Sequence, residues 1–190
     1  MRRAMFILLF LACTGAAFAQ LGEFSVSAGS SKMRNNALGT GDFSDFKATS
    51  NFRLGFRFTI NSWRFLGHEI GYAYNRGKLE GPGFEYGMPV HQGMYNFLAY
   101  ATPEGARIRP FATGGVHFST YYPPGSSVYN GNGSTKFGYN YGAGIKVRLT
   151  SLFMGRVDIR DYTNGKPDFG INPDGKLHQL EVSAGLGIAF

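Results

Sequence analysis

The chain contains a single cysteine, and it lies close to the N-terminus. Cys13 falls within residues 1–19, which have the features of an export signal, so we expect a mature chain with no disulfide and no cysteine-bound metal. His68, His91 and His178 lack the spacing of metal ligands. The sequence also has no phosphate-binding loop and no dinucleotide fingerprint. We therefore expect neither a metal nor an organic cofactor.

Long apolar runs are also missing. The run at 4–12 is about half the length that a membrane-spanning helix needs, and no later segment reaches 18 consecutive apolar residues. Basic Arg2 and Arg3 precede this run, and the small-residue motif Ala17-Phe18-Ala19 follows it. This order predicts a cleavable signal peptide over 1–19 and a mature domain over 20–190.

Two alternatives to cleavage after Ala19 are a retained helical anchor and a lipoprotein signal that ends at Cys13. The first is disfavoured because the apolar run is short. The second requires a lipobox, which Phe10-Leu11-Ala12 fits poorly. Ordinary cleavage remains the interpretation that we carry forward.

Charge of one sign is not concentrated anywhere in the chain. The 19 basic and 12 acidic residues give +7, and loss of Arg2 and Arg3 with the signal leaves +5. The basic residues are scattered among apolar ones, and an exported protein meets little nucleic acid, so no nucleic-acid partner is expected. We assign this charge to a barrel interior and to a surface that faces lipopolysaccharide.

The chain is rich in glycine (28 residues) and aromatics (16%), and its apolar residues alternate with polar ones. Alternation with a period of two is typical of strands, which send successive side chains to opposite faces. Eight strands are predicted, at about 22–29, 51–61, 64–75, 90–101, 108–121, 135–149, 152–162 and 178–190.

The pattern is clearest in the sixth segment and least clear in the fourth. In the sixth, Tyr139 and Tyr141 share an apolar face opposite Lys146. In the fourth, placing the aromatic residues together leaves Met94 and Leu98 on the polar side. The register of that strand is therefore left open.

The connections alternate between long and short. Long ones are expected at 30–50, 76–89, 122–134 and 163–177, with short turns near 62–63, 102–107 and 150–151. Short turns on one rim and long loops on the other are typical of outer-membrane barrels. The pattern predicts four extracellular loops, with both termini on the periplasmic side.

Alternation alone does not decide which face is outside, since a soluble barrel would turn its apolar face inward. Lys or Arg facing lipid at mid-bilayer costs roughly 2–4 kcal/mol each, so a membrane barrel must hold its charges in the lumen. Aromatic residues on the apolar faces and strands of about ten residues favour the membrane barrel. The predicted lumen network consists of Arg53, Arg57, Glu69, Lys146, Arg148, Arg156, Asp158, Arg160 and Glu181.

The segments 142–148 and 156–162 and a last strand that ends on Phe190 resemble the OmpA-type eight-stranded outer-membrane barrels. The resemblance covers 20–190 and implies an all-β, antiparallel, up-and-down transmembrane barrel in the bacterial outer membrane. It also implies that the barrel assembly machinery reads Phe190. Because nothing follows Phe190, we expect no periplasmic peptidoglycan-binding domain.

We expect a monomeric, non-enzymatic protein in contact with outer-membrane lipid and lipopolysaccharide, with a structural, adhesive or surface-binding role for its four loops. Two alternatives stay open. The pair His117 and Ser119 resembles the His-x-Ser motif of lipid A deacylases, although Thr120 stands where that motif has Asn. The excess of basic lumen residues would suit a narrow channel that favours anions.

Overall fold

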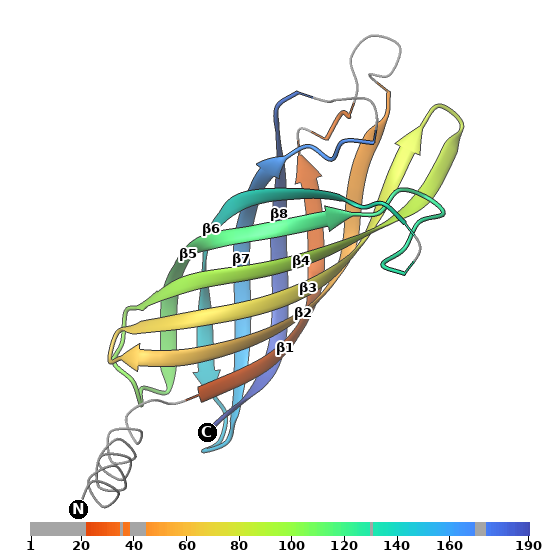
Figure 1. Ribbon diagram of the computed structural model, residues 1–190. Coiled ribbons are helices and arrows are strands. Elements are labelled where there is room, and N and C mark those ends of the chain that lie inside the picture. Colours follow the sequence, from red (N-terminus) through yellow and green to blue (C-terminus); the bar gives the residue numbers. More distant parts are fainter. Residues whose placement is uncertain (1–21, 35, 39–44, 130, 170–173) are drawn as a thin grey trace, which may run out of the picture.

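The computed structural model describes residues 22–34, 36–38, 45–129, 131–169 and 174–190. The predicted signal peptide, 1–19, lies outside the described residues. Eight strands form one closed barrel in chain order, and each strand pairs antiparallel with its neighbours (Figure 1). They are β1 (Gly22–Arg34), β2 (Lys47–Trp63), β3 (Leu66–Gly81), β4 (Phe84–Tyr100), β5 (Ile108–Tyr121), β6 (Ser134–Arg148), β7 (Phe153–Gly165) and β8 (Lys176–Ala189). The predicted fold class is confirmed.

The last strand closes the barrel on the first. The β1–β8 register runs from Glu23 opposite Ala189 to Arg34 opposite His178. Beyond it, the Gly22 amide donates to the Phe190 carbonyl at 2.7 Å, and the Phe190 amide donates back at 2.8 Å. The described chain therefore begins and ends on the same rim, as Figure 1 shows.

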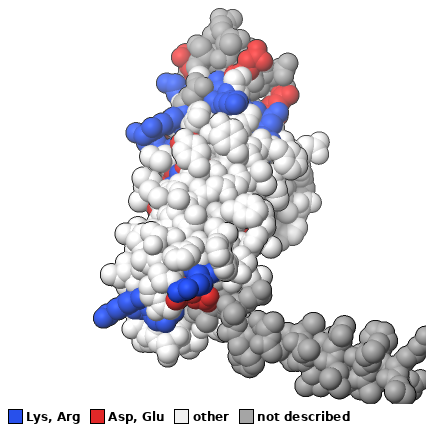
Figure 2. Space-filling model, turned by 90° about the vertical axis from the view of Figure 1, so that its left-hand side faces the viewer, with Lys and Arg blue, Asp and Glu red and all other residues white. Residues whose placement is uncertain are grey.

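Burial is inverted relative to a soluble protein. Arg53 and Glu181 are buried inside the barrel, whereas Ile70 and Leu186 are 61% and 65% exposed on its outer wall. Figure 2 shows the same division from outside, with charged side chains at the two ends and an uncharged band between them. This arrangement places the charges in the lumen and presents the apolar band to lipid.

Of two expected loops, the first is partly strand and the second is almost wholly strand. β1 continues to Arg34 and β2 begins at Lys47, so the first connection is shorter than 30–50. The prediction of a long loop over 76–89 is wrong, because β3 and β4 continue to a two-residue turn at Pro82 and Gly83. Gly83 adopts φ +79°, which a glycine tolerates at a tight turn. The Gly-Pro-Gly signal marked the tip of a hairpin rather than the middle of a loop.

The other rim also differs slightly from expectation. β2 includes Trp63, and the turn falls at Arg64 and Phe65, about two residues later than predicted. The connections between β4 and β5 and between β6 and β7 occupy 101–107 and 149–152. These three connections lie on one rim, which we call the short-turn rim. The described chain also begins and ends there.

The open register of β4 is resolved by burial. Met94 and Leu98 face the lumen at 5% and 0% exposure, while Tyr95 and Phe97 face outward. β4 thus contributes apolar residues to both faces, which explains why its alternation is weak. Within the described residues, no helix is long and apolar enough to cross a bilayer.

A charge placed on the outer wall should destabilise the barrel. Ile70 lies midway along the exposed face of β3, opposite Phe58 and Tyr95. We expect Ile70→Arg to lower the free energy of unfolding in lipid vesicles by about 2–4 kcal/mol, because the guanidinium enters hydrocarbon. Tyr129→Arg, at a position that is 97% exposed in a loop, should change it little. Equal stability of both variants in denaturant titrations would contradict the lipid-facing assignment.

Candidate functional site

The lumen is filled by polar layers between apolar ones, and the first layer lies near the short-turn rim. Glu23 accepts a hydrogen bond from Lys146 and another from Asn61 at 2.9 Å. Arg109 lies 3.7 Å from the Glu23 carboxylate, and its guanidinium stacks 3.6 Å from the centre of the Tyr100 ring. This layer joins strands β1, β2, β4, β5 and β6 across the lumen.

An apolar layer follows. Leu98, Tyr100 and Phe111 pack together and are at most 5% exposed. The Tyr100 hydroxyl accepts from Lys146 at 2.8 Å, and the Arg156 guanidinium lies 5.1 Å from the centre of the Phe111 ring. These rings separate the first charged layer from the next.

The central layer joins two carboxylates to two arginines. Glu69 lies 2.6 Å from Arg156 and 2.8 Å from Arg160. Asp158 lies 2.6 Å from Arg156 and 2.9 Å from Arg160, so each arginine contacts both acids. Such multiply hydrogen-bonded pairs are the form in which charge can remain buried.

Glycine makes room for this layer. A Cβ at Gly142 would fall 2.2 Å from the Ile159 carbonyl oxygen and 2.8 Å from the Cγ of Arg160. The missing side chain therefore lets β6 and β7 pair while Arg160 extends across the lumen.

The next charged layer is centred on Glu181. Its carboxylate lies 2.9 Å from Arg53 and 2.6 Å from Arg57. The hydroxyls of Tyr162 and Ser183 donate to it at 2.8 and 2.6 Å. Four partners from strands β2, β7 and β8 thus surround one acid.

Side-chain amides continue the network toward the far rim, the one opposite the short-turn rim. Gln92 accepts from Arg53 and donates to Ser119 at 2.8 Å and to Gln179 at 2.9 Å. Asn75 accepts from Gln179 at 3.1 Å and from Arg53 at 2.9 Å. The hydrogen bonds therefore run without interruption from Glu181 into this uncharged layer.

An apolar cap closes the lumen above the amides. Its members come from five strands and the adjoining loop, and none is more than 5% exposed. They are Met33, Leu38, Ala48, Met88, Val90, Tyr121 and Leu177. Phe46, Leu79 and Phe169 pack against them. Among the described residues, this cluster places apolar side chains between the polar layers and the far rim.

Eight of the nine predicted lumen residues are buried in these layers, and each makes at least one ion pair. Arg148 is the exception: it is half-buried at the short-turn rim, and no ion pair of the described residues includes it.

Sequence reasoning missed Glu23, Arg109, Tyr100 and Tyr162. In the first predicted strand Glu23 lies on the face opposite Phe24 and Val26, so the alternation could have identified it as a lumen acid. Tyr100 and Tyr162 carry no such signal, because only the packed lumen shows that their hydroxyls contact Lys146 and Glu181.

The His117 and Ser119 pair lies inside the lumen. His117 packs edge-on against Tyr162 with ring centres 5.2 Å apart, while Ser119 accepts from Gln92. The hydrogen bonds of the described residues include none between His117 and Ser119. Both side chains are thus turned away from lipid, whose acyl esters a deacylase must reach. The described residues also contain no group of three or more His, Cys, Asp or Glu placed to hold a metal.

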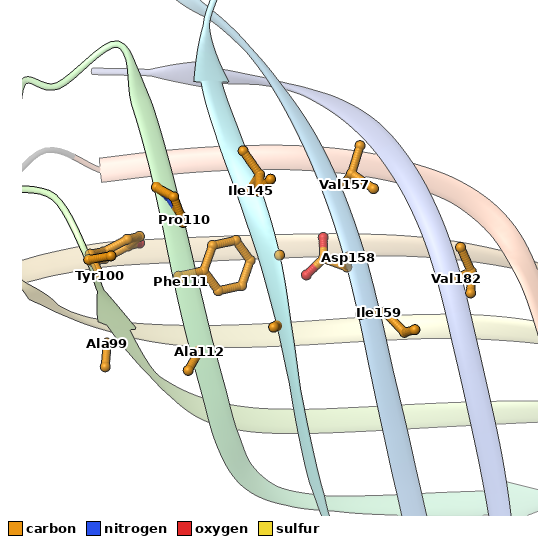
Figure 3. Close-up of a pocket in the computed structure, with 13 residues that line it drawn as sticks. Ala99, Tyr100, Pro110, Phe111, Ala112, Ile145, Val157, Asp158, Ile159 and Val182 are labelled. Carbon is orange, nitrogen blue, oxygen red and sulfur yellow. The ribbon is translucent and has the colours of Figure 1, made fainter.

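A hollow on the outer wall is lined almost wholly by apolar residues (Figure 3). It measures about 700 Å³ and exists because Ala99, Ala112 and Ala143 face one another across β4, β5 and β6. Ile145 and Val157 border it. A lining of this kind suits contact with acyl chains.

Removing the Glu181 charge should destabilise the barrel. Glu181→Gln leaves Arg53 and Arg57 buried without their carboxylate, so we expect a loss of roughly 3–5 kcal/mol. The control Glu85→Gln breaks the exposed Lys78–Glu85 pair and should cost at most about 1 kcal/mol. Trp63, the only tryptophan, reports unfolding by fluorescence. A Glu181→Gln barrel as stable as the parent would show that these pairs do not hold the strands together.

Comparison with known proteins gives one family. Residues 5–190 match the family model of the outer membrane protein beta-barrel domain. No protein with a curated description matches the chain.

Several solved structures share the fold. Neisserial surface protein A gives a TM-score of 0.67 at 15% identity, covering 89% of this chain and 97% of that one. OprG of Pseudomonas aeruginosa gives 0.57 at 14% identity, covering 90% and 94%. Ail of Yersinia pestis, solved with the heparin analogue sucrose octasulfate, gives 0.56 at 11% identity, covering 90% and 99%. With the closed barrel, the exposed apolar band and the charged lumen, the family match means that this chain belongs to the outer membrane β-barrel domain family and resides in the outer membrane.

Proposed function

We propose that this protein is a non-enzymatic, monomeric surface barrel with a closed lumen, which acts by binding through its extracellular end. The observation that carries the proposal is the lumen itself. Ion-pair layers around Glu69 and Glu181 and the apolar cap occupy it in the part of the chain that the structure describes. A barrel without an open interior acts through its outer surfaces.

The far end offers a suitable binding surface. The β3–β4 hairpin extends beyond the end of β5, whose pairing with β4 ends at Val90 and Tyr121 (Figure 1). Tyr86 on this hairpin and Val128 and Tyr129 in the β5–β6 connection are 55%, 57% and 97% exposed. Tyrosines that are exposed in this way are typical anchors of protein-binding surfaces.

The two alternatives have less support. A lipid A deacylase needs its catalytic pair at the lipid face, whereas His117 and Ser119 point into the lumen. The net positive charge of the lumen is the argument for an anion channel. The described buried residues include six cationic side chains and four carboxylates. The apolar cap opposes it, since ions do not cross a dry layer of Met88 and Leu177.

Export and assembly complete the proposal. Residues 1–19 would direct secretion and be removed before the barrel forms. Phe190, whose backbone pairs with Gly22, would be the terminal aromatic read by the barrel assembly machinery.

The closed lumen predicts the absence of conduction. Purified protein in planar lipid bilayers should give no steady current, because ordered ion pairs and the cap block the path. A wide porin in the same membrane is the positive control. Steady, anion-selective steps from this protein would favour the channel instead.

If the protein binds through its extracellular end, the exposed aromatic residues there should contribute to the attachment of cells. Cells that display the protein should attach to surfaces coated with extracellular-matrix protein or heparin. Tyr86→Ser with Tyr129→Ser should weaken attachment at least about thirtyfold, since each aromatic anchor contributes roughly 1–2 kcal/mol. Leu149→Ser, at a 55% exposed site on the opposite rim, is the matched control. Unchanged attachment by the double variant, at equal surface levels, would refute this role.

A further inference from the structure

A small hollow at the short-turn rim carries excess positive charge. It measures about 20 Å³ and lies between the adjoining ends of β5, β6 and β7 and the connection at 149–152. The charged residues that line it are Glu23, Arg107, Arg109, Lys146 and Arg148. Because the short turns of outer-membrane barrels face the periplasm, we call this hollow the periplasmic pocket.

The described lining of the periplasmic pocket sets one carboxylate against four cations. Glu23 accepts a hydrogen bond from Lys146, and its carboxylate lies 3.7 Å from Arg109. Arg107 and Arg148 take part in no ion pair of the described residues. Arg148 is half-buried, so water screens its charge only in part. The pocket therefore has three positive charges more than its own carboxylate balances.

Arg109 has buried hydrogen-bond donors that no described residue accepts from. Its guanidinium is stacked on Tyr100, with 3.6 Å between Cζ and the ring centre, so the orientation of its plane is fixed. The Nε and Nη2 atoms are buried and have no hydrogen-bond partner, while Nη1 is the atom that lies 3.7 Å from Glu23. A buried donor without an acceptor is costly. Water could accept these bonds, but only an anion would also balance the charge.

Another arginine of the same lumen shows what this edge can hold. Arg156 donates to the Asp158 carboxylate from Nε at 2.6 Å and from Nη2 at 2.9 Å. These are the two nitrogens that lack partners in Arg109. The planar guanidinium edge matches the two oxygens of a carboxylate. The geometry of Arg109 therefore favours a carboxylate as the ligand.

The size of the periplasmic pocket limits the ligand further. A water-sized group needs about 10–15 Å³, so a hollow of about 20 Å³ admits roughly one or two such groups. A sugar ring or a whole lipid head group does not fit, whereas the end of a chain does. Thr150 and Ser151, which line the pocket, are exposed in the β6–β7 connection. A ligand can thus enter from the periplasm and leave the rest of its chain outside.

We propose that the periplasmic pocket binds a terminal carboxylate, with the C-terminus of a short peptide as its ligand. Arg109 receives the carboxylate on its Nε–Nη2 edge, and Tyr100 holds the guanidinium in place. Arg107 and Arg148 supply the charge that attracts the ligand to the mouth of the pocket. The site lies at the end of the barrel opposite the extracellular binding surface and does not depend on it.

The test is titration of the purified barrel, in an uncharged detergent, into tri-alanine labelled at its N-terminus with an uncharged dye. Fluorescence anisotropy measures binding. The same peptide with a C-terminal amide lacks the carboxylate and is the ligand control. The carboxylate peptide should bind at least about tenfold more tightly, since it alone makes charge-assisted bonds with Arg109.

Three variants locate the site. Arg109→Lys keeps the charge but loses the planar edge, so it should bind about tenfold more weakly. Arg148→Gln removes a cation that has no ion pair to lose, and should bind about fivefold more weakly. Arg64→Gln is the matched control, because this exposed arginine lies on the same rim outside the pocket, and its effect should stay below about twofold. Gel migration of unheated samples checks folding; if Arg109→Lys fails to fold, Arg148→Gln decides.

Several outcomes would overturn the proposal. Equal binding of the amide peptide would remove the carboxylate as the recognised group. Equal weakening by Arg64→Gln and Arg148→Gln would indicate general attraction to a basic rim. Displacement of the peptide by inorganic phosphate at lower concentration than by acetate would indicate a phosphate site. Displacement by acetate only in large excess supports the peptide C-terminus, whereas displacement at concentrations near that of the peptide supports a carboxylate site for small free acids.

Discussion

Backbone pairing between the first and last strands is the constraint on which this molecule depends. In hydrocarbon no water is available to unpaired amides and carbonyls, so every strand must have two neighbours. Antiparallel pairing of β8 with β1, from the Gly22–Phe190 hydrogen bonds to the Arg34–His178 pair, meets that requirement. Without it, two edges would be exposed to lipid.

Closure also determines where charge can lie. Because lipid surrounds the outer wall, the arginines of β2 and β7 can lie only in the lumen. Each of these buried charges needs a carboxylate partner there. Glu69 on β3 meets Arg160 of β7 across the barrel, and Glu181 on β8 meets Arg53 of β2, with only β1 between the two strands. The filled lumen in turn leaves the two ends of the barrel and the outer wall as the surfaces on which this protein can recognise other molecules.

Much of this was predictable because alternation is a local property. The sixth, seventh and eighth segments alternate cleanly, so their faces, and the lumen position of Arg156, Asp158 and Glu181, follow from parity. The register of β4 could not be predicted because Met94 and Leu98 are apolar residues that face the lumen. Polarity therefore does not mark the inner face of this strand. The sequence does not predict the β3–β4 hairpin as strand, because the part of it beyond the membrane carries charges such as Lys78 and Glu85 on its outer face. Strand pairing there does not need an apolar pattern.

By itself, the sequence determined the number of strands, the two faces of most of them and the closing position of Phe190, since these depend on period and order along the chain. Only the tertiary structure decided which acid meets which base, that Glu23 and Tyr162 join the network, and that an apolar cap seals the far rim. Those contacts join residues far apart in the chain, as between Arg57 and Glu181, which are 124 positions apart. Their geometry depends on strand stagger around a closed barrel, which alternation within a single strand does not encode.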